Sequence, residues 1–370
     1  MKHTDYMALA IDYAKKGCGF VNPNPMVGVV IVGDNQIIAM GYHRRYGEAH
    51  AERNALDTCT ASPKGATMYV TLEPCCHHGK TPPCTEAIIK SGISKVVVGA
   101  RDPNPLVSGK GIEQLRKQGI EIIEEVLTKE CESLNEVFFH YVTTNTPFVL
   151  MKYAMTMDGK AATCSGDSKW ITGEKARKRV QYDRHRYTAI MVGVGTVIKD
   201  DPQLTCRLDG CRSPIRVICD TNLRTPVSSQ IVNTADDYKT IIATACADEE
   251  VIKPYTNAGC RIVTVQKKSG RIDLNDLMIK LGKEGVDSIL LEGGGELNWS
   301  ALQCGIVNKV QTYIAPKVFG GANAKSPVTG NGVNAPDDAY YLENSSITFL
   351  DNDILIESEV KFGKPVISHY

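Results

Sequence analysis

Two stretches of the chain contain residue types that can hold a metal ion and move a proton beside it. The first is His50-Ala51-Glu52, and the second, residues 74–84, reads Pro-Cys-Cys-His-His-Gly-Lys-Thr-Pro-Pro-Cys. One imidazole and two thiolates suit a tetrahedral zinc site better than an iron site. Three protein ligands leave the fourth position open for a water molecule, which the metal acidifies. The sequence therefore predicts one catalytic zinc per chain, with Glu52 as a proton carrier rather than a ligand.

The spacing of these residues limits where the metal can lie. Residues two apart on a regular helix are rotated by about 200°, so His50 and Glu52 would point in opposite directions. The pair can act together only if a helix begins near His50 and the metal lies at its end. A loop containing Gly47 precedes the pair, which agrees with such a start. Cys75 supplies one thiolate, and spacing alone leaves four candidates for the third ligand: Cys76, His77, His78 and Cys84.

A His-x-Glu pair followed by Pro-Cys and a second cysteine is typical of zinc-dependent base deaminases. In that reaction Glu52 would take a proton from the water, deliver it to a ring nitrogen and help the amine leave as ammonia. Two other interpretations are thiols with a purely structural role and a closed zinc site with four protein ligands. Neither interpretation explains why a glutamate accompanies His50.

The elements around these motifs alternate between strands and helices, which implies a layered α/β domain. Helices are expected over residues 5–16, 50–56, 85–91 and 109–118, and strands over residues 27–32, 37–42, 67–72, 94–100 and 120–126. The polar stretch 143–147 ends in a proline and predicts a domain boundary. We therefore expect one domain over residues 1–146 and a second over residues 147–370.

The second half also predicts an α/β domain, with strands over residues 148–154, 189–194, 215–219, 240–245 and 288–291. The triplet Gly293-Gly294-Gly295 follows the last of these strands and precedes a predicted helix. Backbone N–H groups in such a loop can approach a phosphate, although a tight turn without a ligand is an equally good interpretation. The segment 193–196 ends another strand in a similar way. Arg184 and Arg207 could clamp a phosphomonoester, although such arginines are usually solvated.

Composition excludes several classes of protein. The 42 Lys and Arg residues cancel the 42 Asp and Glu residues, whereas a protein that binds long nucleic acids usually carries a basic excess. Thirteen cysteines in 370 residues do not suggest a disulfide framework. We see no signal-peptide core and no run of about 18 apolar residues that would span a membrane. These features predict a cytoplasmic protein with small-molecule partners, no nucleic acid and no membrane.

The cysteine-rich segment, with eight residues between Cys75 and Cys84, resembles the riboflavin-biosynthesis branch of the cytidine deaminase-like superfamily. Residues 22–28 (Asn-Pro-Asn-Pro-Met-Val-Gly) and residues 99–105 (Gly-Ala-Arg-Asp-Pro-Asn-Pro) match the same family. The resemblance implies that His50, Cys75 and Cys84 hold the zinc and that Glu52 is the acid/base. It also implies pyrimidine contacts at five positions: Asn24, His43, Lys80, Asp102 and Asn104.

Residues 147–370 resemble the reductase half of the bifunctional riboflavin deaminase/reductases, a domain similar in fold to dihydrofolate reductase that uses NADPH. The resemblance rests on residues 151–160, 168–172, 193–196, 200–207 and 288–297. It implies cofactor contacts at Ala154, Trp170, Thr196, Asp200, Gly293, Gly294 and Gly295. It implies substrate contacts at Ser168, Arg184, Leu204, Arg207 and Glu292, with the arginines on the substrate phosphate. Asp200 and Lys152 are the candidates for moving protons in the reduction.

Taken together, the sequence predicts an N-terminal cytidine deaminase-like three-layer α/β/α domain followed by a dihydrofolate reductase-like α/β domain. The expected enzyme deaminates a phosphoribosylaminopyrimidine at zinc and then reduces its ribosyl chain with NADPH. The resemblance also implies a homo-oligomer, either a dimer or a tetramer. Two alternatives are a nucleoside or nucleic-acid deaminase with an unrelated appended domain and a non-catalytic protein with a structural zinc.

Overall fold

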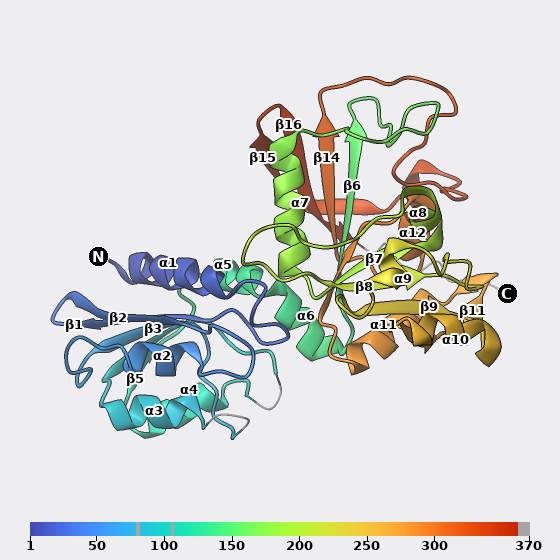
Figure 1. The fold of residues 1–370 in the computed structure, drawn as a ribbon. Helices are drawn as coiled ribbons and strands as arrows, with labels where there is room; N and C mark the ends of the chain where they lie inside the picture. Colours follow the sequence, from blue (N-terminus) through green and yellow to red (C-terminus); the bar gives the residue numbers. More distant parts are fainter. Residues whose placement is uncertain (79–81, 105–106, 362–370) are drawn as a thin grey trace. The chain divides into compact units, whose positions relative to one another are not determined.

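The computed structural model describes residues 1–78, 82–104 and 107–361 (Figure 1). The chain divides into two compact units, and the boundary in the sequence lies between Asn145 and Thr146. Within the described ranges, no helix is both long enough and apolar enough to cross a membrane.

The first unit is built on a five-stranded sheet with strand order β2-β1-β3-β4-β5. Its strands are β1 (Gly28–Gly33), β2 (Gln36–Tyr42), β3 (Thr67–Leu72), β4 (Lys95–Ala100) and β5 (Glu121–Ile123). β1 and β2 form the predicted antiparallel hairpin, β1 also pairs antiparallel with β3, and β3, β4 and β5 are parallel. The carboxyl ends of β3 and β4 therefore lie side by side at one edge, and the loops that follow them can build a common site.

Helices cover both faces of this sheet, which confirms the predicted α/β/α layering. The helices are α1 (His3–Ala14), with a 3₁₀ turn over Lys15–Gly17, α2 (Ala51–Leu56), α3 (Cys84–Ser91), α4 (Lys110–Lys117), α5 (Thr128–Leu134) and α6 (Glu136–Thr144). Apolar side chains of α2, α3 and α4 pack on one face of the sheet, including Ala55, Ile88 and Leu115. Residues of α1 and α5 pack on the other face, including Met7 and Cys131.

The second unit contains a nine-stranded sheet with strand order β10-β9-β8-β7-β13-β6-β14-β16-β15. These strands are β6 (Phe148–Thr156), β7 (Ala189–Gly193), β8 (Ile215–Cys219), β9 (Thr240–Thr244), β10 (Arg261–Thr264), β13 (Ser288–Leu291), β14 (Lys309–Ala315), β15 (Tyr341–Leu350) and β16 (Asp353–Lys361). The run from β10 to β14 is parallel, and the β15–β16 hairpin adds antiparallel strands at the β14 side. A separate small ribbon pairs β11 (Lys267–Lys268) with β12 (Arg271–Ile272).

Helices again cover the sheet of the second unit on both sides (Figure 1). They are α7 (Glu174–Arg186), α8 (Val194–Asp200), α9 (Gln230–Asn233), α10 (Glu249–Asn257), α11 (Leu274–Lys283), α12 (Gly295–Gln303) and a 3₁₀ turn over Pro336–Asp338. Residues of α11 and α12 share one core cluster with strand residues, and residues of α8, α9 and α10 share another. Val180 of α7 packs with Tyr313 of β14 and Leu355 of β16. The parallel core strands leave their carboxyl ends free to carry a site, as is usual in α/β proteins.

Two parts of the secondary structure differ from the sequence prediction. Thr143 and Thr144, which we assigned to the polar boundary, belong to α6, whose left-handed C-cap is Asn145. The strands β14, β15 and β16, which complete one side of the sheet, were not predicted from the sequence.

Candidate functional site

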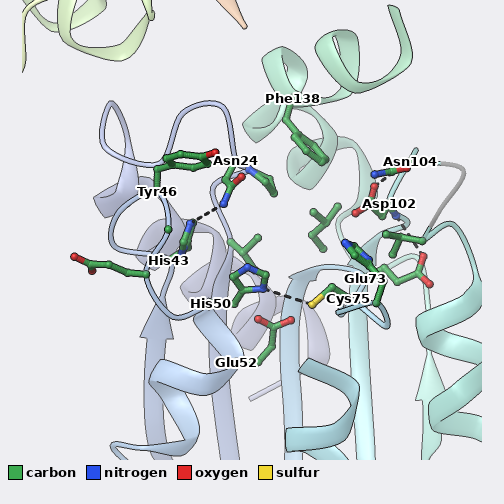
Figure 2. Close-up of a pocket in the computed structure, with 17 residues that line it drawn as sticks. Asn24, His43, Tyr46, His50, Glu52, Glu73, Cys75, Asp102, Asn104 and Phe138 are labelled. Carbon is green, nitrogen blue, oxygen red and sulfur yellow. Dashed lines mark hydrogen bonds between the residues drawn. The ribbon is translucent and has the colours of Figure 1, made fainter. Parts of the chain in front are cut away.

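The first unit contains a pocket of about 320 Å³ beyond the carboxyl ends of β3 and β4. Figure 2 shows Asn24, His43 and Tyr46 on one side of this pocket and Asp102 and Asn104 on the other. His50 and Cys75, two of the predicted metal ligands, lie between these two groups, with Glu52 directly beneath them (Figure 2). The pocket thus brings together residues from five separate segments of the chain.

His50, Cys75 and Cys84 form the one group of possible metal ligands in the described ranges, and their ligand atoms lie within 4.8 Å of one another. His50 Nδ1 is 3.5 Å from Cys75 Sγ and 3.4 Å from Cys84 Sγ. Two ligand atoms bound tetrahedrally to zinc at about 2.0 and 2.3 Å lie about 3.5 Å apart, so these residues fit a zinc ion. The imidazole would bind through Nδ1.

Local structure explains why these three side chains meet. His50 is the N-cap of α2, so its backbone is extended and its side chain does not follow the helical rotation that separates positions two apart. Cys84 is the first residue of α3, and its backbone N–H donates to Cys75 Sγ at 3.4 Å. The Cys84 thiol, this N–H group and His50 lower the pKa of Cys75 to about 4, although burial opposes them. A thiolate is the form that binds zinc.

The structure also distinguishes between the four candidates for the third ligand. Cys84 is buried beside His50, whereas His77 and His78 are exposed. His78 Nε2 lies 3.3 Å from Glu86 Oε1 at the surface of α3. Cys76 is half-buried and does not belong to the three-residue group.

Glu52 lies in the first turn of α2 and is only 3% exposed. Burial and the negative charge of Cys75 raise the pKa of Glu52 to about 7, although His50 opposes the rise. A carboxyl group with a pKa near neutrality can both accept and release a proton under ordinary conditions. The side chain therefore has the position and the acidity that proton transfer beside the metal needs.

Asn24 and His43 are joined by a hydrogen bond of 3.3 Å between Asn24 Nδ2 and His43 Nε2. His43 Nδ1 lies 3.1 Å from the Ala49 carbonyl oxygen, which can only accept, so Nδ1 carries the proton. Burial lowers the pKa of His43, which keeps the ring neutral. Nε2 then accepts from the Asn24 amide, and Asn24 Oδ1 is left to accept a hydrogen bond from a ligand. The His43 ring also packs edge-on against His50, with centroids 5.4 Å apart.

On the opposite side of the pocket, Asp102 is buried and accepts the Asn104 backbone N–H at 2.8 Å. Burial raises the pKa of Asp102 to about 6, even though the Asn104 N–H opposes the rise. Lys80, the remaining predicted pyrimidine contact, lies outside the described residues.

Several lining residues were not identified as site residues from the sequence, among them Tyr46, Glu73 and Phe138. Phe138 belongs to α6, a helix that the sequence analysis did not predict, so nothing placed it near the metal. Glu73 directly precedes Pro74 and Cys75, but this adjacency does not indicate that its carboxylate is buried beside the pocket.

In the second unit, the structure brings three predicted residues together at the end of β13. Arg184 Nε and Nη2 donate to the two oxygens of Glu292 at 2.9 and 3.0 Å, and Nη1 donates to the Thr205 carbonyl at 3.1 Å. Burial would raise the pKa of Glu292, but the charges of Arg184 and Lys152 lower it to about 2. Burial lowers the pKa of Lys152, whose Nζ lies 5.5 Å from the Tyr313 ring centroid.

Both halves of the chain match known protein families. Residues 1–100 match the cytidine and deoxycytidylate deaminase zinc-binding region, and residues 147–356 match the RibD C-terminal domain. The riboflavin biosynthesis protein RibD of Actinobacillus pleuropneumoniae is 52% identical over 357 residues, covering 96% of this chain and 95% of that protein. The chain belongs to the RibD family.

Solved structures agree with this assignment. A diaminohydroxyphosphoribosylaminopyrimidine deaminase/5-amino-6-(5-phosphoribosylamino)uracil reductase from Thermotoga maritima is 41% identical, with a TM-score of 0.85 over 97% of this chain and 99% of that one. RibD from Acinetobacter baumannii is 35% identical, with a TM-score of 0.87 and the same coverage. The chain is therefore a bifunctional deaminase and reductase of riboflavin biosynthesis, with a cytidine deaminase-like domain and a dihydrofolate reductase-like domain. The alternative of an unrelated appended domain is wrong, because the second half is the RibD C-terminal domain.

The glycine triplet of the reductase domain follows β13, as the sequence predicted, and its last residue, Gly295, begins α12. A Cβ on Gly295 would lie 2.7 Å from the Thr329 side chain, and one on Gly293 would lie 2.8 Å from Asn298 Oδ1. A Cβ on Gly294 would meet no atom of the chain within 4 Å. The loop is therefore closely packed at both ends and open in the middle.

The other predicted cofactor and substrate positions of the RibD reductase domain are distributed over several elements. Thr196 and Asp200 belong to α8, and Leu204 is buried in the loop that follows it. Ala154 of β6 packs against the α7 cluster, and Arg207 and Trp170 are exposed. The Arg177 guanidinium carbon lies over the Trp170 ring, 4.7 Å from the ring centroid. Ser168, two residues before Trp170, is half-buried.

Proposed function

We propose that the first domain deaminates 2,5-diamino-6-(5-phosphoribosylamino)pyrimidin-4(3H)-one hydrolytically. The second domain then reduces the ribosyl side chain with NADPH and gives 5-amino-6-(5-phosphoribitylamino)uracil. The observation that carries the first half of this proposal is the buried Glu52, which lines the pocket beside the His50, Cys75 and Cys84 group.

His50 Nδ1, Cys75 Sγ and Cys84 Sγ would hold the zinc. Zinc in a site with three protein ligands lowers the pKa of a water molecule and so makes it a nucleophile near neutral pH. Glu52 would accept a proton from that water, because its raised pKa and its burial beside the ligands suit it to this task. The same carboxyl group would then deliver the proton to the ring nitrogen and assist the departure of ammonia.

The pyrimidine would be held between the two sides of the pocket (Figure 2). Asn24 Oδ1 is available to accept from a ring N–H or amino group, because His43 already accepts from the Asn24 amide nitrogen. Asp102 and Asn104 would contact the opposite edge of the ring. Lys80 is proposed as a further contact from the family resemblance.

In the second domain, NADPH would supply the hydride that reduces the first carbon of the open-chain sugar. Cofactor contacts are proposed at Ala154, Trp170, Thr196, Asp200 and the glycine triplet 293–295. Substrate contacts are proposed at Ser168, Arg184, Leu204, Arg207 and Glu292. Lys152 lies close enough to Glu292 and Arg184 for their charges to alter its pKa, so it is well placed to assist with protons, and Asp200 is the second candidate.

A matched pair of variants tests the deaminase assignment in the full chain. Glu52→Gln keeps the shape of the buried side chain but removes its proton chemistry, so we expect ammonia release to fall by about 10²–10⁴-fold. Reduction of the deaminated pyrimidine, followed as NADPH oxidation, should be unchanged. Glu48→Gln alters an exposed carboxylate at the same pocket and should leave both reactions unchanged. Retained deamination in Glu52→Gln would contradict the assignment.

A further inference from the structure

Glu73 is a buried carboxylate that the proposed chemistry does not use. It follows β3, stands two residues before the ligand Cys75 and is 3% exposed. Its Oε1 accepts the backbone N–H groups of Gly111 at 3.0 Å and Ile112 at 3.2 Å. Its Oε2 accepts the backbone N–H groups of Gly109 at 2.9 Å and Asp102 at 3.4 Å. Four donors thus surround one carboxylate beside the pocket.

These four donors lie at the two ends of the connection from β4 to α4. Asp102 lies near its start, two residues after the end of β4, and the other three lie at its end and in the first turn of α4. The Glu73 backbone N–H also donates to the Ala100 carbonyl, the last residue of β4, at 2.9 Å. One side chain therefore ties both ends of this connection to the segment after β3 that carries Cys75.

The backbone around Glu73 is built for this close approach. A Cβ on Gly111 would lie 2.1 Å from the Pro74 carbonyl oxygen, so only glycine lets the first turn of α4 come this near. Gly109, the residue before α4, has a φ of +75°, which a residue with a side chain rarely adopts. Both glycines place N–H groups on the Glu73 oxygens.

We infer that Glu73 is a positioning residue of the deaminase reaction. By holding the Asp102 backbone, it sets the distance between the Asp102–Asn104 side of the pocket and the zinc ligands, and so determines how tightly the pyrimidine binds. A carboxylate whose oxygens already accept four backbone N–H groups is suited to hold a loop in place. This inference rests on the proposed function, because it takes Asp102 and Asn104 as pyrimidine contacts.

Glu73→Gln in the full chain tests this role. The amide replaces one acceptor oxygen with an N–H donor that faces backbone N–H groups, so the connection from β4 to α4 should shift. We expect the KM for deamination to rise about tenfold or more while kcat stays within about threefold of wild type, because substrate binding is lost rather than proton transfer. Zinc content and reductase activity should match wild type.

Glu124→Gln is the matched control. The Glu124 carboxylate binds the side chains of Arg101, next to Asp102, and of Arg116 in α4, so it joins the same two segments through side chains alone. Its KM should equal that of wild type. Should Glu73→Gln fail to fold, Gly109→Ala is a milder perturbation, since it strains the φ of one donor and leaves the carboxylate in place. Its KM should rise in the same direction.

Three results would overturn the role of Glu73. An unchanged KM in a less stable variant would make Glu73 merely structural. A large fall in kcat at constant KM would make it a proton carrier, and a loss of zinc would make it part of the metal site. Failure of the proposed function would look different, because the wild-type chain itself would release no ammonia from the pyrimidine.

Discussion

The ion pair between Arg184 and Glu292 gives a quantitative prediction about the stability of the reductase domain. Both side chains are largely buried, with exposed fractions of 13% and 14%. The pKa of Glu292 is about 2, against 4.5 for an unperturbed glutamate. At about 1.4 kcal/mol per pH unit, this depression corresponds to a contribution of about 3 kcal/mol to the free energy of unfolding at neutral pH.

The pH dependence follows from the direction of this change. Because the folded state lowers the pKa of Glu292, its contribution is fully present above pH 4.5 and is lost as the pH falls toward 2. We therefore expect Glu292→Gln to reduce the free energy of unfolding by about 3 kcal/mol at pH 7 and by only about 2 kcal/mol at pH 3.5. The larger value agrees with the general cost of about 3–5 kcal/mol for removing one partner of a buried ion pair.

Tryptophan fluorescence makes this measurement possible in the full chain. Both tryptophans, Trp170 and Trp299, belong to the second unit, and Trp299 is buried. Urea unfolding followed by tryptophan emission therefore reports on the reductase domain. The control is Glu296→Gln, which breaks an exposed pair with Arg271 and should cost about 0–1 kcal/mol. Equal losses at the two pH values, or a loss no larger than that of the control, would refute the reasoning.

Two further predictions concern the metal ligands and the glycine triplet. Cys84→Ser should lose zinc and deamination, whereas Cys76→Ser should keep both, because Cys84 lies beside His50 and Cys75 and Cys76 does not belong to that group. Metal analysis and an assay of ammonia release check this prediction. Zinc retained by Cys84→Ser would contradict it. Gly294→Ala should raise the KM for NADPH about tenfold without lowering the stability of the domain. The added Cβ would meet no atom of the chain within 4 Å but would occupy space proposed for the cofactor. An unchanged KM for NADPH, with normal deamination, would count against a cofactor contact at Gly294.

Local sequence patterns predicted the elements that carry the zinc ligands. β3 and α2 lie where the sequence predicted them, and the His-x-Glu spacing required a helix to begin near His50, which is the N-cap of α2. Spacing alone could not identify the third zinc ligand among its four candidates, because the loop between Cys75 and Cys84 has no periodicity that fixes the direction of its side chains. The family resemblance supplied that choice, and the geometry of the three ligands agrees with it.

Elements that depend on distant partners were harder to predict. In β15 every residue from Tyr341 to Phe349 is exposed, so no alternation between apolar and polar residues marks the strand. Its conformation depends on pairing with β16, and β16 in turn depends on β14, about 45 residues earlier in the chain. A short edge hairpin of this kind has little local signal.

The site itself shows the same division between local and distant information. A glutamate next to Pro-Cys carries no local signal that its carboxylate will be buried, because its four N–H donors come from Asp102 and from residues 109–112. Glu52 could be predicted because its chemistry requires it to stand near a ligand in sequence. Glu73 could not, because its contacts exist only once β3 and β4 have paired. Positioning residues of this kind are therefore found from the hydrogen bonds of the folded chain, whereas reacting residues can be found from motifs.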